Sequence, residues 1–565
     1  MIKHLMKFKK RFVIYIVAAL GIIFSGAFVQ DFFEVSQQMD IFTSVYKEVN
    51  QFYVDEIKPG ELMKKGITGM LKNLDPYTVY YPDAEIEDYR LTHSGGEYGG
   101  IGASSFRDGD SIVISDIYEG YAAQKAGMRV GDILIEVNNR SLKGLEPDAV
   151  EDLIKGQSST NVRLKVLRLG QPMEFNIKRE EIKVTNLPYY GMINDSVGYI
   201  KLDKFMQGCY DEMEKAVKEL KKDTSLKAVI FDIRGNGGGL VDQTVAILNL
   251  FIAKDVLLVA QKGKISSANI KYTTSKEPLL GEVPMAILID RNSASASEIT
   301  AGNFQDLDRG VIIGQRSFGK GLVQQTRSLS FGTQMKVTVA KYTTNSGRCV
   351  QALNYASRNE DGSVDKVPDS LITAFKTRNG RTVFDGSGVY PDRFMEPANY
   401  SNITRSLLNK YLLFDYATIF RSKHDSIPPP QKFSLSDTDY KDFVTFLNDK
   451  EYNYNTSTEN EFAGLKKITK EEKYYDNIKD DLDQLGVKLK HNKNDDLYNF
   501  KNEIIQLLEK EIVTRYYYSS GSFKYSFVND SVVADALKVI GDPILYSSIL
   551  KGEGAYKVIG KPKVK

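Results

Sequence analysis

Three short segments of the sequence hold residues that could together carry out nucleophilic acyl transfer. In the first, Ser293, Ser295 and Ser297 alternate with alanine just after an apolar run. Glu298 and Ile299 then open a predicted helix. A serine at a strand-to-helix turn exposes its hydroxyl, and amides at the helix start can face an oxyanion. A tightly packed helix N-cap would show the same pattern, so both interpretations stay open for this segment alone.

The second segment places Lys320 between Gly319 and Gly321. Glycines allow the backbone to approach closely, and a lysine removed from water in such a pocket can act as a base. A lysine on a solvated turn would have the same neighbours. The segment is not a phosphate-binding loop, because that motif requires a hydroxyl residue where Gly321 stands.

The third segment is the glycine-rich run IRGNGGGL at 233–240, which follows the apolar stretch AVIFDI. Glycines at the end of a buried strand let a backbone amide point into a cleft as an oxyanion donor. The spacing does not fit a dinucleotide-binding fingerprint. By itself the run could also be a simple loop.

The elements around these segments predict an α/β core. Between residues 197 and 350 the pattern alternates strand, glycine loop and helix, and the stretches at 226–233 and 285–290 are apolar on both faces. Strands buried on both faces belong to a layered sheet covered by helices. Residues 36–92 have a helical period, and the chain beyond 395 is polar and helical.

The N-terminus predicts export. A basic run (Lys3, Lys7, Lys9, Lys10 and Arg11) precedes the uncharged residues 12–29. Eighteen residues of helix span about 27 Å, close to the thickness of a hydrocarbon core. The positive-inside rule then places residues 1–11 in the cytoplasm and the rest outside. A cleaved signal peptide, with small residues at 25–27, is the alternative, and both interpretations export the remainder.

Composition makes several other functions unexpected. The net charge is only +2, and no basic block lies beyond the N-terminus, so nucleic-acid binding is not expected. Cys209 and Cys349 could form at most one disulfide, so no disulfide framework organises the fold. The four histidines are scattered and predict no metal site.

Taken together, the three segments resemble those of the C-terminal processing peptidases, serine peptidases with a Ser–Lys dyad in a crotonase-like α/β core. The resemblance implies that Ser295 is the nucleophile and that Lys320, 25 residues later, is the general base. It implies that Gln324 orients the lysine amine. The amides of Ala296 and of a glycine in the third segment, for which we choose Gly238, would hold the oxyanion. No cofactor is implied.

Other parts of the chain share this resemblance. The segments LDPYTVYYP (74–82), YTTNSGRCVQ (342–351) and GSGVYPD (386–392) resemble the corresponding segments of the family, so the likeness spans about residues 36–395. An acid is common in the family at the position of Asp306. We expect this residue to be structural rather than catalytic.

The β-rich region at 95–182 resembles a PDZ domain. Its segment EYGGIGASS (97–105) corresponds to the carboxylate-binding loop, in which consecutive amides bind a free C-terminus. The predicted peptide-binding residues are Gly99, Gly100, Ile101 and Gly102. The segment 148–156 would be the helix that lines the groove. A glycine-rich turn without a ligand is the alternative.

The sequence therefore predicts a multi-domain α/β protein with a crotonase-like core, an inserted PDZ domain and helical regions at both ends. The expected order is a cytoplasmic tail (1–11), a transmembrane anchor or signal segment (12–29), an N-terminal helical region (36–92), a PDZ domain (95–182), a Ser–Lys peptidase core (183–395) and a C-terminal helical accessory domain (396–565). We expect a single-pass inner-membrane protein with a periplasmic catalytic part. Its expected partners are proteins with free apolar C-termini, with a regulatory adaptor or a homo-oligomer also considered.

Two alternatives remain at this point. The chain could be a catalytically inactive PDZ scaffold on a peptidase-like core, although the joint presence of Ser295, Lys320 and Gln324 favours an enzyme. It could also be a crotonase-like acyl-coenzyme A enzyme, but the export segment and the PDZ resemblance argue against this.

Overall fold

The computed structural model describes residues 33–83, 86, 98–183, 185–355, 358–359, 361–489 and 493–560. The predicted anchor or signal segment at 12–29 and the basic tail lie outside these residues. Within the described part of the chain, no helix is both long and apolar enough to cross a membrane. The chain forms two compact units, one of Met1–Pro82 with Ser328–Lys336 and one of Asp83–Arg327 with Val337–Lys565.

The smaller unit contains helical and β structure. A helix covers residues 33–52, and α2 (Pro59–Lys72) begins at a proline, which is well suited to a first helical turn. Strand β1 (Val79–Tyr81) pairs antiparallel with the beginning of β18 (Gln334–Thr343), with Tyr80 opposite Met335. The predicted N-terminal helical region is thus helical over much of its described length.

The centre of the larger unit is a six-stranded sheet in the order β10-β11-β12-β15-β16-β21. Its strands are β10 (Tyr189–Met192), β11 (Val197–Lys201), β12 (Ala228–Asp232), β15 (Met285–Ile289), β16 (Val311–Gly314) and β21 (Arg393–Phe394). Strand β10 is antiparallel to β11, and the other neighbours are parallel. Because parallel strands end at the same edge, the loops after β12, β15 and β16 meet there.

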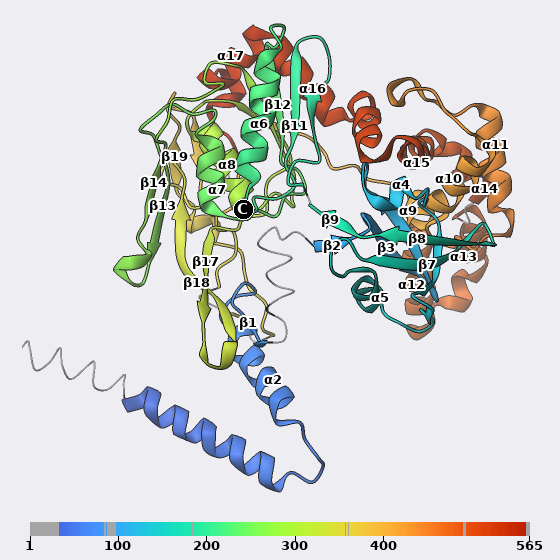
Figure 1. Ribbon diagram of the computed structural model, residues 1–565, viewed down its shortest axis with the longest axis horizontal. Helices are drawn as coiled ribbons and strands as arrows, with labels where there is room; N and C mark the ends of the chain where they lie inside the picture. Colours follow the sequence, from blue (N-terminus) through green and yellow to red (C-terminus); the bar gives the residue numbers. More distant parts are fainter. Residues whose placement is uncertain are drawn as a thin grey trace, which may run out of the picture. The chain divides into compact units, whose positions relative to one another are not determined.

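Helices cover both faces of this sheet, as the apolar strands predict. One face packs against α6 (Cys209–Lys222), α7 (Val241–Leu248) and α8 (Ala296–Asp306). The other face packs against α16 (Ser531–Gly541) and α17 (Pro543–Lys551), drawn in red in Figure 1. Successive residues of β12 point to opposite faces of the sheet. Val229 and Phe231 contact the first group of helices, and Ala228 and Ile230 contact the second. The end of the C-terminal extension therefore completes the α/β core.

A second sheet follows the order β1-β18-β13-β14, with β17 paired to β18. Its strands besides β1 and β18 are β13 (Leu257–Gly263), β14 (Lys271–Thr273) and β17 (Leu322–Ser328). A small hairpin of β19 (Ala374–Lys376) and β20 (Thr382–Phe384) lies further along the chain.

The region predicted as a PDZ domain is a six-stranded antiparallel sheet with two helices. The elements are β3 (Ala103–Asp108), β4 (Ser111–Ile117), α4 (Ala122–Lys125), β5 (Ile133–Val137), β6 (Arg140–Ser141), α5 (Pro147–Ile154), β7 (Asn161–Arg168) and β8 (Gln171–Lys178). A separate pair, β2 (Tyr98–Gly100) with β9 (Glu180–Ile182), closes the domain where the chain enters and leaves it.

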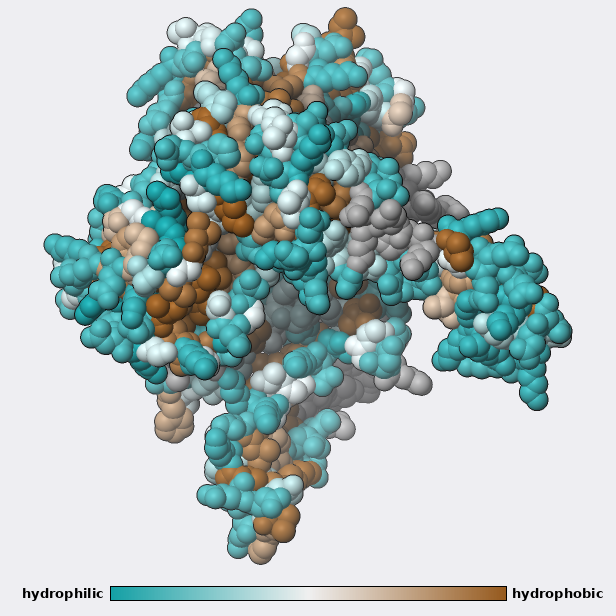
Figure 2. All heavy atoms as spheres, turned by 90° about the vertical axis from the view of Figure 1, so that its right-hand side faces the viewer, coloured by the Kyte–Doolittle hydropathy of each residue, from teal (hydrophilic) through white to brown (hydrophobic). Residues whose placement is uncertain are grey.

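Residues 402–529 form a helical bundle that contacts the β-rich domain. Its helices are α9 (Asn402–Asn409), α10 (Leu412–Lys423), α11 (Asp437–Phe446), α12 (Ser457–Glu471), α13 (Tyr475–Leu489), α14 (Lys493–Asn499) and α15 (Lys501–Asn529). The ring of Phe106 on β3 lies 4.5 Å from that of Tyr411 and 5.3 Å from that of Phe414. Figure 2 shows that this side of the molecule is mostly hydrophilic, with apolar side chains in separate patches.

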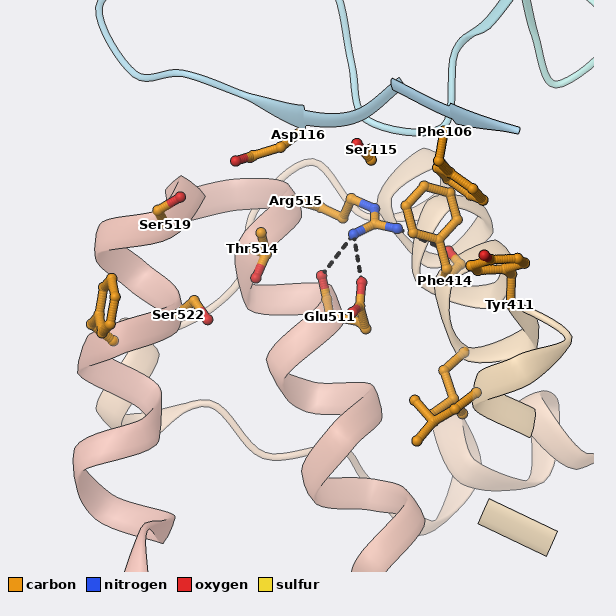
Figure 3. Close-up of a pocket in the computed structure, with 13 residues that line it drawn as sticks. Phe106, Ser115, Asp116, Tyr411, Phe414, Glu511, Thr514, Arg515, Ser519 and Ser522 are labelled. Carbon is orange, nitrogen blue, oxygen red and sulfur yellow. Dashed lines mark hydrogen bonds and ion pairs between the residues drawn. The ribbon is translucent and has the colours of Figure 1, made fainter. Parts of the chain in front are cut away.

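A cavity of about 570 Å³ lies where the bundle meets the β-rich domain (Figure 3). The Arg515 guanidinium forms one wall and is bonded to Glu511 over 2.9 Å and to the carbonyl of Phe414 over 3.0 Å. One turn later, α15 is broken at Tyr518, whose φ of 55° is not helical. The second half of the helix then reaches the core sheet, where Phe527 packs on Tyr199.

Candidate active site

Ser295 lies at the sharp turn between β15 and α8, as predicted. It is the N-cap of α8 and has φ 56° and ψ −111°, a conformation that non-glycine residues rarely adopt. The side chain is half-buried, whereas Ala294 and Ala296 on either side are buried. Backbone strain of this kind persists only where the surroundings hold it, and it is common at functional sites. Ser295 thus caps the helix, and the surrounding structure fixes its backbone while its hydroxyl stays partly exposed.

The glycine-rich loop after β12 packs directly against this turn. Gly238 has φ +103°, and a Cβ placed on it would lie 2.8 Å from the Cβ of Ser295 and 3.0 Å from the amide nitrogen of Ala296. Only glycine fits here. Ala296 is the first residue of α8, so its N–H has no acceptor within the helix. The N–H of Gly238 donates to Oδ1 of Asn236 over 2.8 Å.

Lys320 lies in the loop between β16 and β17, at the same edge of the sheet as Ser295. The loop is attached to α8 by Glu298, a fully buried residue. Oε1 of Glu298 accepts bonds from the Ser317 hydroxyl and the Gly319 N–H over 2.6 and 2.7 Å. Oε2 accepts from the N–H groups of Lys320 and Ser295 over 2.7 and 2.9 Å. One carboxylate therefore holds the backbones of both predicted dyad residues.

The electrostatics of Glu298 follow from these bonds. Burial raises the pKa of its carboxyl above the usual value, and the four donors act in the opposite direction. All four groups donate hydrogens, so the geometry suits an ionised carboxylate, which accepts only. A protonated acid would place a hydrogen against one of these donors.

Tyr342 ties the two segments a second time. Its hydroxyl lies 3.0 Å from the carbonyl oxygen of Ser295 and 2.9 Å from that of Lys320. The side chain is 1% exposed. Burial, together with the nearby charge of Glu298, raises the pKa of Tyr342 well above its usual value, so the hydroxyl stays a neutral donor.

The two remaining motif segments pack around the lysine loop. Oε1 of Gln351 accepts from the N–H of Gly321 over 2.8 Å. The backbone of Val389 pairs with Ser317, both through the Ser317 N–H (3.0 Å) and through its hydroxyl (2.7 Å). The segments 342–351 and 386–392 therefore brace the loop that carries Lys320.

Gln324 lies on β17, four residues after Lys320. Its Nε2 donates to Oγ1 of Thr338 on the neighbouring strand β18 over 3.1 Å. The predicted role of Gln324 in orienting the lysine amine stays a prediction.

Asp306 occupies the end of α8 and is buried. Its carboxylate pairs with Arg348 at 2.8 Å and accepts from the Thr344 hydroxyl over 2.6 Å and the Ser346 N–H over 3.0 Å. These bonds attach the segment 342–351 to α8 and fit the expected structural role.

Cys209 and Cys349 are both free, so the disulfide left open by the sequence does not form. In the described residues, no group of three or more histidine, cysteine, aspartate or glutamate side chains could hold a metal ion.

The predicted peptide groove lies between β3 and α5. It is a cavity of about 190 Å³ whose lining includes Gly100, Ile101 and Gly102 as well as Ile154 and Lys155 of the helix end. Gly99 and Gly100 belong to β2 and pair with β9, while Ile101 and Gly102 form the turn into β3. Gly102 has φ +75°, and a Cβ there would meet Tyr121 at 2.3 Å. Gly100, Ile101 and Gly102 therefore line this cavity and Gly99 does not, and the binding of a peptide by these residues stays a prediction.

Three residues of this site were not predicted: Glu298, Tyr342 and Asn236. Glu298 follows Ser295 by three residues, the spacing of a capping box, so the sequence held a signal for it. Tyr342 and Asn236 come from distant segments. Asn236 is fully buried, and its carbonyl accepts from the Ala294 N–H over 3.0 Å and the Ser297 hydroxyl over 2.8 Å.

Comparisons with known families match three parts of the chain. Residues 196–355 match "Peptidase family S41", residues 113–168 match "PDZ domain", and residues 403–540 match "Probable PDZ-protease, C-terminal helical domain". These matches confirm the predicted α/β core, PDZ insertion and helical C-terminal part.

The chain is also similar to curated proteins. It is 34% identical over 311 residues to a "Probable CtpA-like serine protease" of Staphylococcus aureus (strain MRSA252) and 32% identical over 303 residues to one of Staphylococcus haemolyticus. The match covers 54% of this chain in both cases, and it spans 61% and 60% of those relatives. Among solved structures, a photosystem II D1 C-terminal processing protease is 26% identical, with a TM-score of 0.34, over 55% of this chain and 89% of that one. Residues 196–355 therefore belong to peptidase family S41, and the chain joins this core to a PDZ domain and a C-terminal helical domain.

Proposed function

We propose that this protein is a serine endopeptidase that cleaves protein substrates near their C-termini, with Ser295 as nucleophile and Lys320 as general base. The observation that carries the proposal is the double attachment of the two residues. Glu298 bonds to both of their amides, and Tyr342 bonds to both of their carbonyls. A catalytic pair must be held in a fixed relation to act together.

The reaction would begin with attack of the Ser295 Oγ on the scissile carbonyl carbon. The hydroxyl proton passes to the neutral amine of Lys320 as the C–O bond forms. Lys320 then gives this proton to the leaving amine as the C–N bond breaks. Water, deprotonated by the same amine, hydrolyses the acyl-enzyme and restores the serine.

The oxyanion would be held by backbone amides. The N–H of Ala296 is available at the start of α8, where the helix dipole also favours negative charge. Gly238 is the second proposed donor. Its N–H donates to Asn236 in this structure, so it would exchange that acceptor for the oxyanion.

The PDZ domain would bind the free C-terminus of the substrate. The lining of the groove beside α5 includes the Ile101–Gly102 turn, whose amides suit a terminal carboxylate. Ile114 and Ile154 lie in the same lining beside polar side chains and suit an apolar last residue. Peptides ending in a free apolar residue should bind the protein. Equal affinity for the same peptides with an amidated C-terminus would contradict this part of the proposal.

We also propose that the protein acts outside the cytoplasm, attached to the inner membrane or released after cleavage of its N-terminal segment. The support is the basic run followed by the uncharged residues 12–29. Cell fractionation with protease added to spheroplasts tests this. A catalytic part that stays protected from the added protease would contradict it.

The central experiment compares Ser295→Ala and Lys320→Ala with Ser267→Ala and Lys264→Ala, which change exposed residues far from the site in sequence. Both dyad variants should lose cleavage of a C-terminally tagged protein while the controls keep it. Wild-type rates in either dyad variant would contradict the assignment. An intact wild-type protein that binds peptides but neither cleaves nor reacts with a fluorophosphonate at Ser295 would instead be a PDZ scaffold.

A further inference from the structure

Asp530 lies between α15 and α16 and makes bonds in two directions with its two oxygens. Oδ1 accepts from the N–H groups of Val532 and Val533 over 2.9 and 3.2 Å and so caps α16. Oδ2 pairs with the Arg234 guanidinium over 2.8 Å. The two side chains are 22% and 21% exposed, so solvent screens the pair only partly.

Arg234 is the first residue of the glycine-rich loop after β12. Its guanidinium also pairs with the buried Asp232 over 2.6 Å, and its N–H donates to the same carboxylate over 2.8 Å. The Arg234 carbonyl accepts from the Lys201 amine. Arg234 is therefore held on one side by the sheet and on the other by the C-terminal helical segment. An arginine suits this position because its planar fork binds two carboxylates at once.

The loop that starts at Arg234 reaches the nucleophile within a few residues. Asn236 bonds to the Ala294 N–H and the Ser297 hydroxyl, on either side of Ser295. Gly238 follows and lies against Ser295 itself. A shift at the beginning of the loop is therefore passed to the amide proposed as an oxyanion donor, and such donors act only when correctly aimed.

We propose that Asp530 is a positioning residue for catalysis, which through Arg234 fixes the loop 234–238 beside Ser295. Asp530 comes from the C-terminal helical region, outside the residues that match peptidase family S41. The end of that region thus does more than cover the sheet. The inference rests on the proposed peptidase function and adds to it a residue about 235 positions beyond the nucleophile.

The variant that tests this is Asp530→Asn, assayed in the full chain. Asparagine caps helices as well as aspartate, so Oδ1 keeps its role at α16. The amide NH2 that replaces Oδ2 cannot accept from Arg234. We expect kcat to fall about tenfold with KM and PDZ-peptide affinity unchanged. Affinity for a peptide aldehyde, whose adduct on serine carries the oxyanion, should fall by a similar factor.

The matched control is Asp542→Asn. Asp542 caps α17 in the same way, with Oδ1 accepting from Ile544 and Leu545 over 3.0 Å each, and should keep full activity after substitution. A wild-type kcat in Asp530→Asn would overturn the positioning role. So would a loss of kcat that is fully explained by a lowered melting temperature. Neither result would affect the proposed peptidase function. An inactive wild-type enzyme would overturn the proposed function and this inference with it.

Discussion

The backbone amides of Ser295 and Lys320 donate to the same atom, Oε2 of Glu298, over 2.9 and 2.7 Å. The two residues lie on different loops of the sheet, and this link joins the loops together with the Tyr342 hydroxyl and the bond from the Phe318 N–H to the Ser293 carbonyl. Glu298 is part of α8 and is fully buried, which gives the shared acceptor a rigid support. The relation of nucleophile to base is therefore set by the backbone and a third side chain.

The first prediction is that Glu298→Gln strongly reduces activity without unfolding the protein. Glutamine has the same shape, but its NH2 group would face two N–H or O–H donors whose hydrogen bonds the carboxylate oxygen accepted. The loops that carry Ser295 and Lys320 should therefore shift. We expect kcat/KM to fall about a hundredfold, because a displacement of about 1 Å can have an effect of this size. Steady-state cleavage of a tagged substrate measures it.

Glu277→Gln, which changes an exposed glutamate on the surface of the core, is the control and should behave as wild type. Circular dichroism should show the same helical content in both variants. Full activity in Glu298→Gln would mean that the shared carboxylate does not hold the dyad.

The second prediction concerns the hydroxyl of Tyr342. Tyr342→Phe keeps the ring but leaves the carbonyls of Ser295 and Lys320 without their shared partner. We expect kcat to fall roughly tenfold and stability to fall by about 1 kcal/mol, the net contribution of one buried hydrogen bond, because the Ser295 carbonyl keeps its bonds from the N–H groups of Glu298 and Ile299. Tyr190→Phe, which loses a bond to the surface residue Glu219, should change neither. Kinetics and thermal unfolding of both variants check this, and parallel behaviour of the two would refute it.

The sequence predicts the strands of the core sheet but not all of the helices that cover it. The apolar strands β12 and β15 predict a sheet with two covered faces, and the serine turn and lysine loop follow from their positions after strands. What the pattern could not indicate is which helices cover the second face. The buried side chains of α16, Val533, Ala536 and Val539, pack on strands that include β15, which lies about 240 residues or more earlier in the sequence.

The same limit applies within the site. Glu298 has a local signal, because the spacing of a capping box links it to Ser295. Tyr342 and Asp530 have none, since their roles depend on contacts between distant segments. The bond between Gly238 and Asn236 is also invisible in the sequence, which shows only that a flexible loop is present.

The third prediction uses the pKa of Asp232. Burial opposes ionisation of this carboxyl, but Arg234 and Lys201 outweigh it and lower the pKa from 3.8 to about 2. An acid whose pKa is lower in the folded state stabilises the fold above its unfolded pKa, and this stabilisation is lost as pH falls from about 4 to about 2. Asp232→Asn should therefore lower stability by about 2 kcal/mol near neutral pH.

Melting temperatures measured between pH 7 and pH 3 check this third prediction. The gap between wild type and Asp232→Asn should be widest above pH 4 and should narrow below it. Asp195→Asn, at an exposed turn, should show no gap at any pH. A gap that stays constant through the acid range would show that the ionised carboxylate is not the source of the stability.

The fourth prediction concerns the contact between α10 and α15 in the helical bundle. The Arg515 guanidinium bonds to Glu511 and the carbonyl of Phe414, and it lies 4.2 Å from the centre of the Phe414 ring (Figure 3). Its side chain is 2% exposed. Arg515→Ala should destabilise α10 and α15 by about 1–2 kcal/mol, because the Phe414 carbonyl and the Glu511 carboxylate each lose one hydrogen bond and the Phe414 ring loses a packing contact.

Hydrogen exchange of the whole chain is the suitable measurement, since several domains do not unfold as one unit. Exchange should rise in α10 and α15 and stay unchanged in β12 and β15. Arg515→Lys should not restore protection, because an ammonium cannot reproduce the planar contacts with Phe414. Arg405→Ala, on the exposed side of α9, is the control. If exchange in α15 matched that control, the buried guanidinium would not be what joins α15 to α10.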